Sequence, residues 1–200
     1  MKAICTLICL TLGGQATAAV FDDPQWPCVQ RKVENLSLGI MWPHPISEAP
    51  LRESIAEAGN ELVQTLALRR VDLTEAEALI RDFAATHPDL TRDDLGHLFR
   101  AVFERISTDR TSLIGGISRY SLQQISLSEA IDQTRAKMAT LMQAEDPDFD
   151  EVDRLEEKLD WDERIYYDRA QSLTYVCETP VLLEKRAYAI AQMLLQHVPQ

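Results

Sequence analysis

The stretch FRAVFERISTDRTSLIGGISRYSLQQISLSEAIDQTRAKMATL, from Phe99 to Leu141, contains thirteen positions that follow one another at alternating spacings of four and three residues. That spacing puts the set on one side of an α-helix and is typical of a helix that packs lengthwise against another. Ten of the thirteen positions are apolar, and the phase survives the polar stretch 107–112. We therefore predict one long helix, although Gly115-Gly116 could kink it. The positions are Phe99, Phe103, Ile106, Arg110, Leu113, Ile117, Tyr120, Gln124, Leu127, Ile131, Thr134, Met138 and Leu141.

The same spacing resumes after an acidic stretch. Two such helices joined by a short polar loop are expected to fold back into an antiparallel, coiled-coil-like hairpin, with arms 92–144 and 151–177. If the loop centres near residue 147, Gln124 lies level with Arg169, and Cys177 lies near Gly115-Gly116. The second set of positions is Val152, Leu155, Leu159, Asp162, Tyr166, Arg169, Leu173 and Val176.

Helix signals also occur on both sides of the hairpin. A helix is expected over 47–70, and a capping box of Thr74 with Glu77 predicts the start of another, which ends near His87. Thr179-Pro180 predicts the start of a last helix, because proline is tolerated at the first helical position. The sequence thus predicts an all-α, elongated bundle of about five helices over residues 47–200.

A second cap is expected at the start of the long helix. Thr91 with Asp94 has the spacing of an N-terminal cap, and Leu90 and Leu95 lie where a hydrophobic staple would close over it. These signals predict that the first arm of the hairpin begins near residue 92.

Residues 20–46 differ from the rest of the chain. They hold four of the nine prolines, and Leu36, Leu38, Ile40 and Trp42 alternate at a period of two. An isolated strand has no partner in an all-helical protein. We therefore predict an extended strap across the bundle, anchored by Trp26 and Trp42 and pinned by Cys28, with its backbone close to Gly115-Gly116.

Residues 1–19 have the pattern of a secretory signal peptide. Lys2 precedes an apolar run from Ala3 to Leu12, and Ala16-Thr17-Ala18 fits the small-x-small pattern of a cleavage site. The run is about half the length that a membrane span needs. We expect cleavage near Ala18 or Ala19 and a soluble, exported chain in the periplasm or outside the cell.

Cleavage would leave two of the four cysteines, Cys28 and Cys177. An exported chain meets an oxidising compartment, so the two are expected to form a disulfide. Two free thiols and an intermolecular bridge are the alternatives. A CxxC motif, which would favour a redox-active pair, is missing from the sequence.

The charge of the chain argues against nucleic-acid binding. The formal net charge is -12, and it becomes -13 when Lys2 is removed with the signal peptide. An acidic surface repels phosphate backbones and anionic membranes, and no run of basic residues offsets this. We expect no nucleic acid as a partner and no insertion into a membrane.

Motifs that carry chemistry are scarce. The sequence has no nucleophile elbow, no phosphate-binding loop and no Glu-x-x-His pair of the kind that builds di-iron bundles. Within the predicted helices only Asp93 and Asp94 lie one turn from a histidine, His97. We therefore expect neither an enzyme nor a cofactor.

The acidic stretch DPDFDEVDRLEE, from Asp146 to Glu157, has partial calcium-loop spacing. Asp146, Asp148, Asp150 and Glu157 match positions one, three, five and twelve of such a loop. The sixth position should be glycine but is a glutamate, and the later residues already belong to the next helix. Capping of that helix by Asp148 or Asp150 explains the carboxylates better, which leaves a weak calcium site as a minor alternative.

Three functions remain open at this stage. We favour a non-enzymatic exported protein that acts by contact as an adaptor, accessory subunit or assembly factor in the cell envelope. Its docking point would be the acidic tip, where Phe149 lies between Asp148 and Asp150. The first alternative is a small-ligand binding or sensing bundle, and the second is a low-affinity calcium-binding protein. The ligand pocket would be lined by Tyr120, Gln124, Tyr166 and Arg169.

Overall fold

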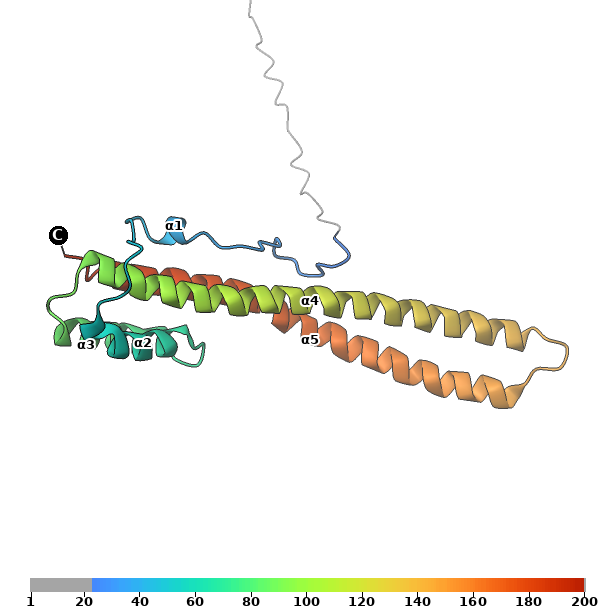
Figure 1. Ribbon diagram of the computed structural model, residues 1–200. Helices are drawn as coiled ribbons and strands as arrows, with labels where there is room; N and C mark the ends of the chain where they lie inside the picture. The colour runs from blue at the N-terminus through green and yellow to red at the C-terminus, as the bar shows by residue number, and fades with distance from the viewer. Residues whose placement is uncertain (1–22, 200) are drawn as a thin grey trace, which may run out of the picture.

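The computed structural model describes residues 23–199, and the predicted signal peptide lies outside these residues. The described chain forms α1 (Leu38–Met41), α2 (Glu53–Ala67), α3 (Leu73–Thr86), α4 (Arg92–Met142) and α5 (Phe149–Leu195), with no strand in this range. Helices α4 and α5 run antiparallel as one long hairpin, and α2 and α3 lie against one end of it (Figure 1). The prediction of an elongated all-α bundle is confirmed.

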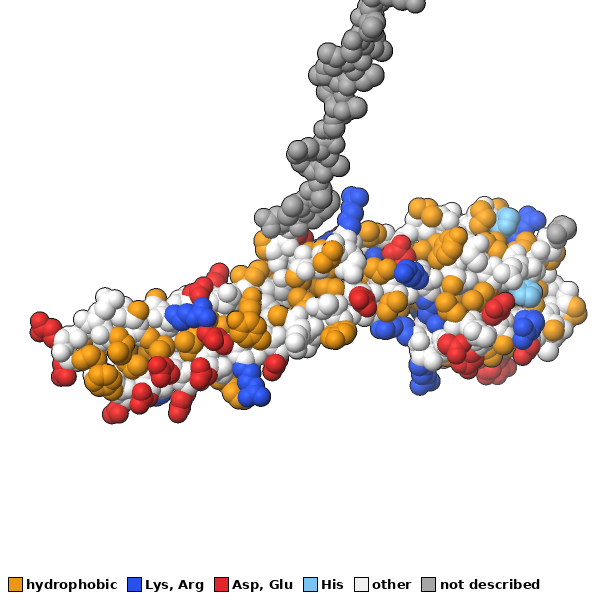
Figure 2. Space-filling model, turned by 180° about the vertical axis from the view of Figure 1, so that it is seen from behind, with side chains coloured by type: hydrophobic (Ala, Val, Ile, Leu, Met, Phe, Trp, Pro, Cys, Tyr) orange, Lys and Arg blue, Asp and Glu red, His pale blue; other side chains and the backbone are white. Residues whose placement is uncertain are grey.

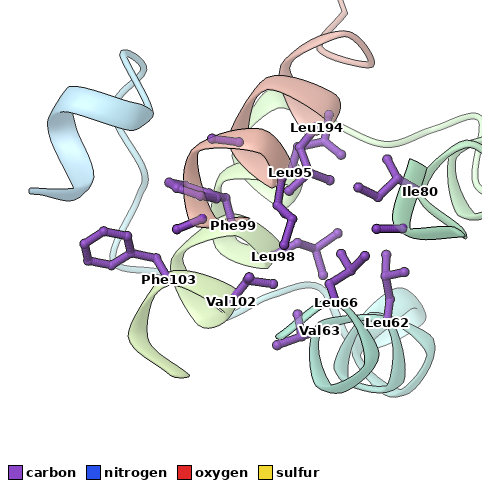
Figure 3. Packing of buried hydrophobic residues seen from close by; sticks show 14 of the residues in the cluster. Leu62, Val63, Leu66, Ile80, Leu95, Leu98, Phe99, Val102, Phe103 and Leu194 are labelled. Carbon is purple, nitrogen blue, oxygen red and sulfur yellow. The ribbon is translucent and has the colours of Figure 1, made fainter. Parts of the chain in front are cut away.

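The main hydrophobic core lies at the end of the hairpin that carries α2 and α3. Figure 3 shows Leu62, Val63 and Leu66 of α2 facing α4, with Ile80 of α3 and Leu194 of α5 closing the cluster. From α4 the cluster takes residues spaced as one helix face, including Leu95, Phe99 and Val102, which are at most 1% exposed. We call this end of the molecule the head.

The starts of α3 and α4 follow different signals. Thr91 and Asp94 form the predicted capping box of α4, and Leu90 and Leu95 are both buried in the core. The predicted capping box of Thr74 with Glu77 is wrong. Asp72 caps α3 instead and accepts a hydrogen bond from the Glu75 backbone N–H at 2.8 Å. An aspartate two residues earlier offers the same chemistry, so the helix begins there.

The predicted break between residues 177 and 179 is also wrong. Helix α5 passes through Pro180 without interruption and runs to Leu195. Proline in a helix costs about 3 kcal/mol, because it lacks the N–H that would bond four residues back. Beyond it α5 buries Leu183, Ala187 and Ile190 in the head, which more than offsets that cost. The number of helices still reaches five because α1 forms a single turn.

The strap runs antiparallel to α4. Its contacts follow one another in reverse order along the helix: the Ser121 hydroxyl donates to the Pro24 carbonyl, and Arg110 donates to that of Glu34. Trp42 stacks on Phe99 with ring centroids 5.6 Å apart. The strap is therefore extended as predicted, except for α1, where the period-two pattern gives way to one helical turn.

The predicted close approach of the strap to Gly115-Gly116 is wrong. A methyl group built on either glycine would meet only the guanidinium of Arg119 within 4 Å. The close approach occurs at Gly96, where such a methyl group would lie 2.9 Å from Ile46. A larger residue at position 96 would push the strap off α4.

Candidate functional site

The middle of the hairpin is where the strap is fastened. Cys28 and Cys177 form the predicted disulfide, with Cα atoms 5.5 Å apart. Beside it Trp26 is buried against Ile114 and Ile117 of α4, and its indole N–H donates to the Gln30 carbonyl at 2.6 Å. A covalent bond and an aromatic anchor together hold the strap on this side of the hairpin.

The polar layer of the hairpin differs in register from the prediction. Gln124 donates from Nε2 to the backbone carbonyl of Tyr166 at 3.0 Å, so it lies level with Tyr166 and not with Arg169. The shift arises because α5 begins at Phe149, which moves the loop centre toward α4. The Tyr120 hydroxyl donates to the Arg169 carbonyl at 3.4 Å. The Arg169 side chain has no partner within residues 23–199.

The residues predicted to line one ligand pocket border two separate grooves. Gln124 and Tyr166 line a groove of about 360 Å³ that Pro27 of the strap also borders. Tyr120 lines another, of about 220 Å³, between α4 and α5. Leu173 belongs to both grooves and Arg169 to neither. The structure thus brings three of these four side chains to grooves and leaves the fourth outside them.

The acidic tip is a helix start. The Asp148 carboxylate accepts the backbone N–H of Glu151 at 3.0 Å and caps α5, while Asp150 lies in the first turn. Asp146 lies in the connecting turn and Glu157 two turns into α5, and all four candidate calcium ligands are exposed. Across the described range, no three His, Cys, Asp or Glu side chains gather as a metal site.

Phe149 stands out at this tip. It is the first residue of α5 and is 60% exposed, so it does not fold back onto the helices that it joins. The carboxylates on either side of it, Asp148 and Asp150, are exposed as well.

One polar cluster could not be found from the sequence. Asp93 accepts hydrogen bonds from the Ser47 backbone N–H at 2.7 Å and from the Ser47 hydroxyl at 2.5 Å, which lower the pKa of this carboxyl. Nε2 of His97 lies 3.4 Å from the Ser47 hydroxyl and 3.5 Å from Asp93. A proton relay would use both ring nitrogens, one toward each partner. Here both partners face the same nitrogen, so the cluster ties the chain before α2 to the start of α4.

Two buried arginines are also structural. Arg186 of α5 donates to the carbonyls of Leu66 and Val71, at 2.8 and 2.6 Å, and joins α5 to the end of α2 and the turn after it. Arg110 of α4 donates to backbone carbonyls of the strap and of α5. Burial lowers the pKa of both guanidinium groups. Their hydrogen bonds go to carbonyl groups at positions where chain segments meet.

No helix within residues 23–199 is long and apolar enough to cross a lipid bilayer. In comparisons with protein-family models, with curated proteins and with solved structures, nothing matches this chain.

Proposed function

We propose that this chain is an exported, non-enzymatic protein that acts by contact with a protein partner in the cell envelope, as an adaptor, accessory subunit or assembly factor. The observation that carries the proposal is the far half of the hairpin. We call residues 126–166 the arm. It projects from the head without α2, α3 or the strap beside it, apart from the groove that Pro27 borders at its base (Figure 1).

The arm contributes little to the cores of the protein. From Ser126 to Met142 it extends about 25 Å at the usual helical rise. In that length and in the facing part of α5, the buried side chains are Ile131, Thr134 and Val152. Such a thin seam holds two helices together but adds nothing to the packing of the head. Reach is therefore the property that the arm supplies.

The arm also presents apolar side chains to solvent. Met142, Phe149 and Trp161 are each more than half exposed, and Phe149 and Met142 flank the turn. Aromatic side chains of this kind are enriched among residues that dominate binding energy in protein interfaces. The arm therefore offers anchors for an apolar pocket on a partner.

Charge restricts the kind of partner. The arm has 13 acidic and 5 basic residues, and Figure 2 shows red side chains around the orange ones along it. Four of the five basic residues are held by carboxylates of the arm: Arg135 by Glu163, Lys137 and Arg154 by Glu151, and Lys158 by Asp162. Asp146, Asp148 and Asp150 lack a cationic partner in the described chain. A partner with a basic rim around an apolar pocket complements this tip.

Export is supported by two features. The signal-peptide pattern of residues 1–19 precedes the described chain, and the disulfide between Cys28 and Cys177 suits an oxidising compartment.

A pull-down tests the proposal. The tagged chain is mixed with the native envelope fraction, beside variants Phe149→Ala and Tyr188→Ala. Tyr188 is the matched control, because it is an aromatic residue of α5 that is 52% exposed but lies in the head part of the helix. We expect a partner to be retained by the wild type and by Tyr188→Ala and lost with Phe149→Ala. Equal retention by all three, or no partner for the wild type, would contradict docking by the tip.

A further inference from the structure

A small apolar groove lies at the base of the arm, between α4 and α5. Its walls are formed by Leu113 and Ile117 on α4 and by Leu173 and Val176 on α5, and its volume is about 220 Å³. Two hydroxyl groups also border it, but both are engaged. Tyr120 donates to the Arg169 carbonyl, and Ser172 to the Asp168 carbonyl. The groove thus offers a ligand an apolar surface.

Gly116 lines the groove and leaves space there, because it has no side chain. A methyl group built there would meet nothing within 4 Å except Nη2 of Arg119 at 3.9 Å. Glycine inside a helix costs about 1 kcal/mol relative to alanine, and no neighbour at Gly116 demands it for packing. No strap residue from Asp23 onward lines this groove, and Pro27 and Cys28 border other grooves that share Leu173 with it.

The guanidinium of Arg119 lies next to Gly116, which lines the groove. The Arg119 guanidinium folds back along α4, with Nη1 3.3 Å from a methyl group built on Gly115 and Nη2 near Gly116. Arg119 is exposed and has no carboxylate partner in the part of the chain that the structure describes. A free guanidinium beside an apolar groove complements a ligand that has a negative head and a hydrocarbon tail.

We propose that this groove binds a small anionic amphiphile with a single aliphatic chain. The chain lies against Leu113, Leu173 and Val176, above Gly116, and the negative head pairs with Arg119. The volume is smaller than the roughly 300–1,000 Å³ of pockets for drug-sized ligands, so a short chain fits. This site is at the base of the arm, whereas the docking proposal concerns its tip, so either can fail without the other.

The test uses three probes with the same eight-carbon tail: octanoate, octyl glucoside and octyltrimethylammonium. Each is added to the ¹⁵N-labelled protein, and amide shifts are followed by NMR. A chain with a formal net charge of -12 attracts cations in general, so an anion preference must come from the site itself. We expect octanoate to bind most tightly, with the largest shifts at Gly116 and Ser172. Equal or tighter binding of the other two probes, or shifts elsewhere only, would overturn the proposal.

Two pairs of variants separate the tail from the head. Gly116→Leu fills the groove and should weaken octanoate binding by at least about tenfold, the equivalent of one buried aliphatic side chain. Ser126→Leu, which adds the same side chain at an exposed position of α4 outside the groove, should leave the affinity within about twofold of the wild-type value. Octanoate binding that survives Gly116→Leu in a folded protein would reject this groove as the site.

The second pair of variants each removes a positive charge from the surface, where a substitution does not disturb folding. Arg119→Gln should weaken octanoate binding about threefold or more and leave octyl glucoside unchanged. Arg164→Gln is the control, because Arg164 is an exposed arginine of α5 that does not border the groove. Equal effects of the two substitutions would show a general charge effect and overturn the role of Arg119.

Discussion

Nε of Arg110 on α4 donates a hydrogen bond to the carbonyl oxygen of Pro180 on α5, over 3.3 Å. The same guanidinium donates from Nη1 to Glu34 of the strap at 3.2 Å, and Nη2 lies 3.9 Å from the Glu184 carboxylate. Burial lowers the pKa of Arg110, and the negative charge of Glu184 offsets part of that lowering. One side chain that is 4% exposed thus joins the strap and both long helices.

Arg110→Ala should therefore be costly. It removes a buried donor from two carbonyls and leaves a cavity, and we expect the free energy of unfolding to fall by about 2–4 kcal/mol. Arg105→Ala, an exposed change on the same helix, should alter it by less than about 0.5 kcal/mol. Urea denaturation measures both, and similar losses for the two variants would contradict the joining role of Arg110.

The disulfide should contribute most through the unfolded chain. It closes a loop of 149 residues, for which the chain-entropy estimate approaches about 5 kcal/mol as an upper value. Cys28→Ser with Cys177→Ser should lower the free energy of unfolding by about 2–4 kcal/mol, and dithiothreitol should destabilise only the wild type. Melting curves with and without the reductant decide this. A wild type that melts at the same temperature in both would show that the bond adds no stability.

Asp94 should make the stability of the head depend on pH. It is 3% exposed, accepts from Arg52 at 2.7 Å and from the Thr91 hydroxyl at 2.6 Å. Burial raises the pKa of Asp94, but the hydrogen bonds from Arg52 and Thr91 outweigh it, so the pKa lies below its usual value. The lower folded-state pKa means that the contribution is complete above about pH 4, the unfolded value, and is lost as the pH falls through the folded value.

Asp94→Asn should thus lower the free energy of unfolding by about 2–3 kcal/mol at pH 7. The difference from the wild type should narrow below about pH 4. Asp109→Asn, an exposed change on α4, is the control. Chemical denaturation at a series of pH values is the measurement, and a difference that stays constant down to pH 2 would refute the linkage.

Asp148 should stabilise the arm locally. Loss of an N-terminal cap costs about 0.5–2 kcal/mol, and the arm is held by a thin seam. Asp148→Ala should speed amide exchange in the first turns of α5 while leaving the head unchanged, because locally stable regions open independently. Asp146→Ala, in the turn, should have no such effect. Hydrogen exchange measured by mass spectrometry tests this. Identical exchange rates in the two variants would contradict the capping role of Asp148.

Calcium should have no specific effect. The Asp148 carboxylate already accepts a backbone N–H, and Glu157 lies two turns into α5. We expect millimolar CaCl2 to raise the melting temperature no more than MgCl2 does. A calcium-specific rise that Asp146→Asn abolishes would restore the metal site as the function of the stretch from Asp146 to Glu157.

The hairpin could be predicted because long helices carry their own signal. The seam of α4 buries Ile106, Ile117 and Ile131, all of which the three-four spacing names. The start of α4 was also predictable, since the side chains of Thr91 and Asp94 each accept a hydrogen bond from the backbone of the other residue, three positions away. Both features depend on residues close together in the sequence, where periodicity and capping chemistry are decided.

The wrong predictions concern features that depend on contacts between residues far apart in the sequence. Thr179-Pro180 has the local form of a helix start, but the packing of Leu183 and Ile190 in the head carries α5 through the proline. The register of Gln124 depends on the residue at which α5 begins. The groove at Gly116 and the cluster of Ser47 with His97 depend on chain segments that meet only in three dimensions.

The bridge between Cys28 and Cys177 also sets an order of events during biosynthesis. A chain is made from its N-terminus, so Cys28 cannot form this bond until Cys177, 149 positions later, has been synthesised. In a chain that has lost residues 1–19, which hold Cys5 and Cys9, any earlier partner of Cys28 has to be a thiol from another molecule. The strap can therefore be fastened only after nearly all of the hairpin, up to Cys177 on α5, has been synthesised, although the strap itself precedes the hairpin in the chain.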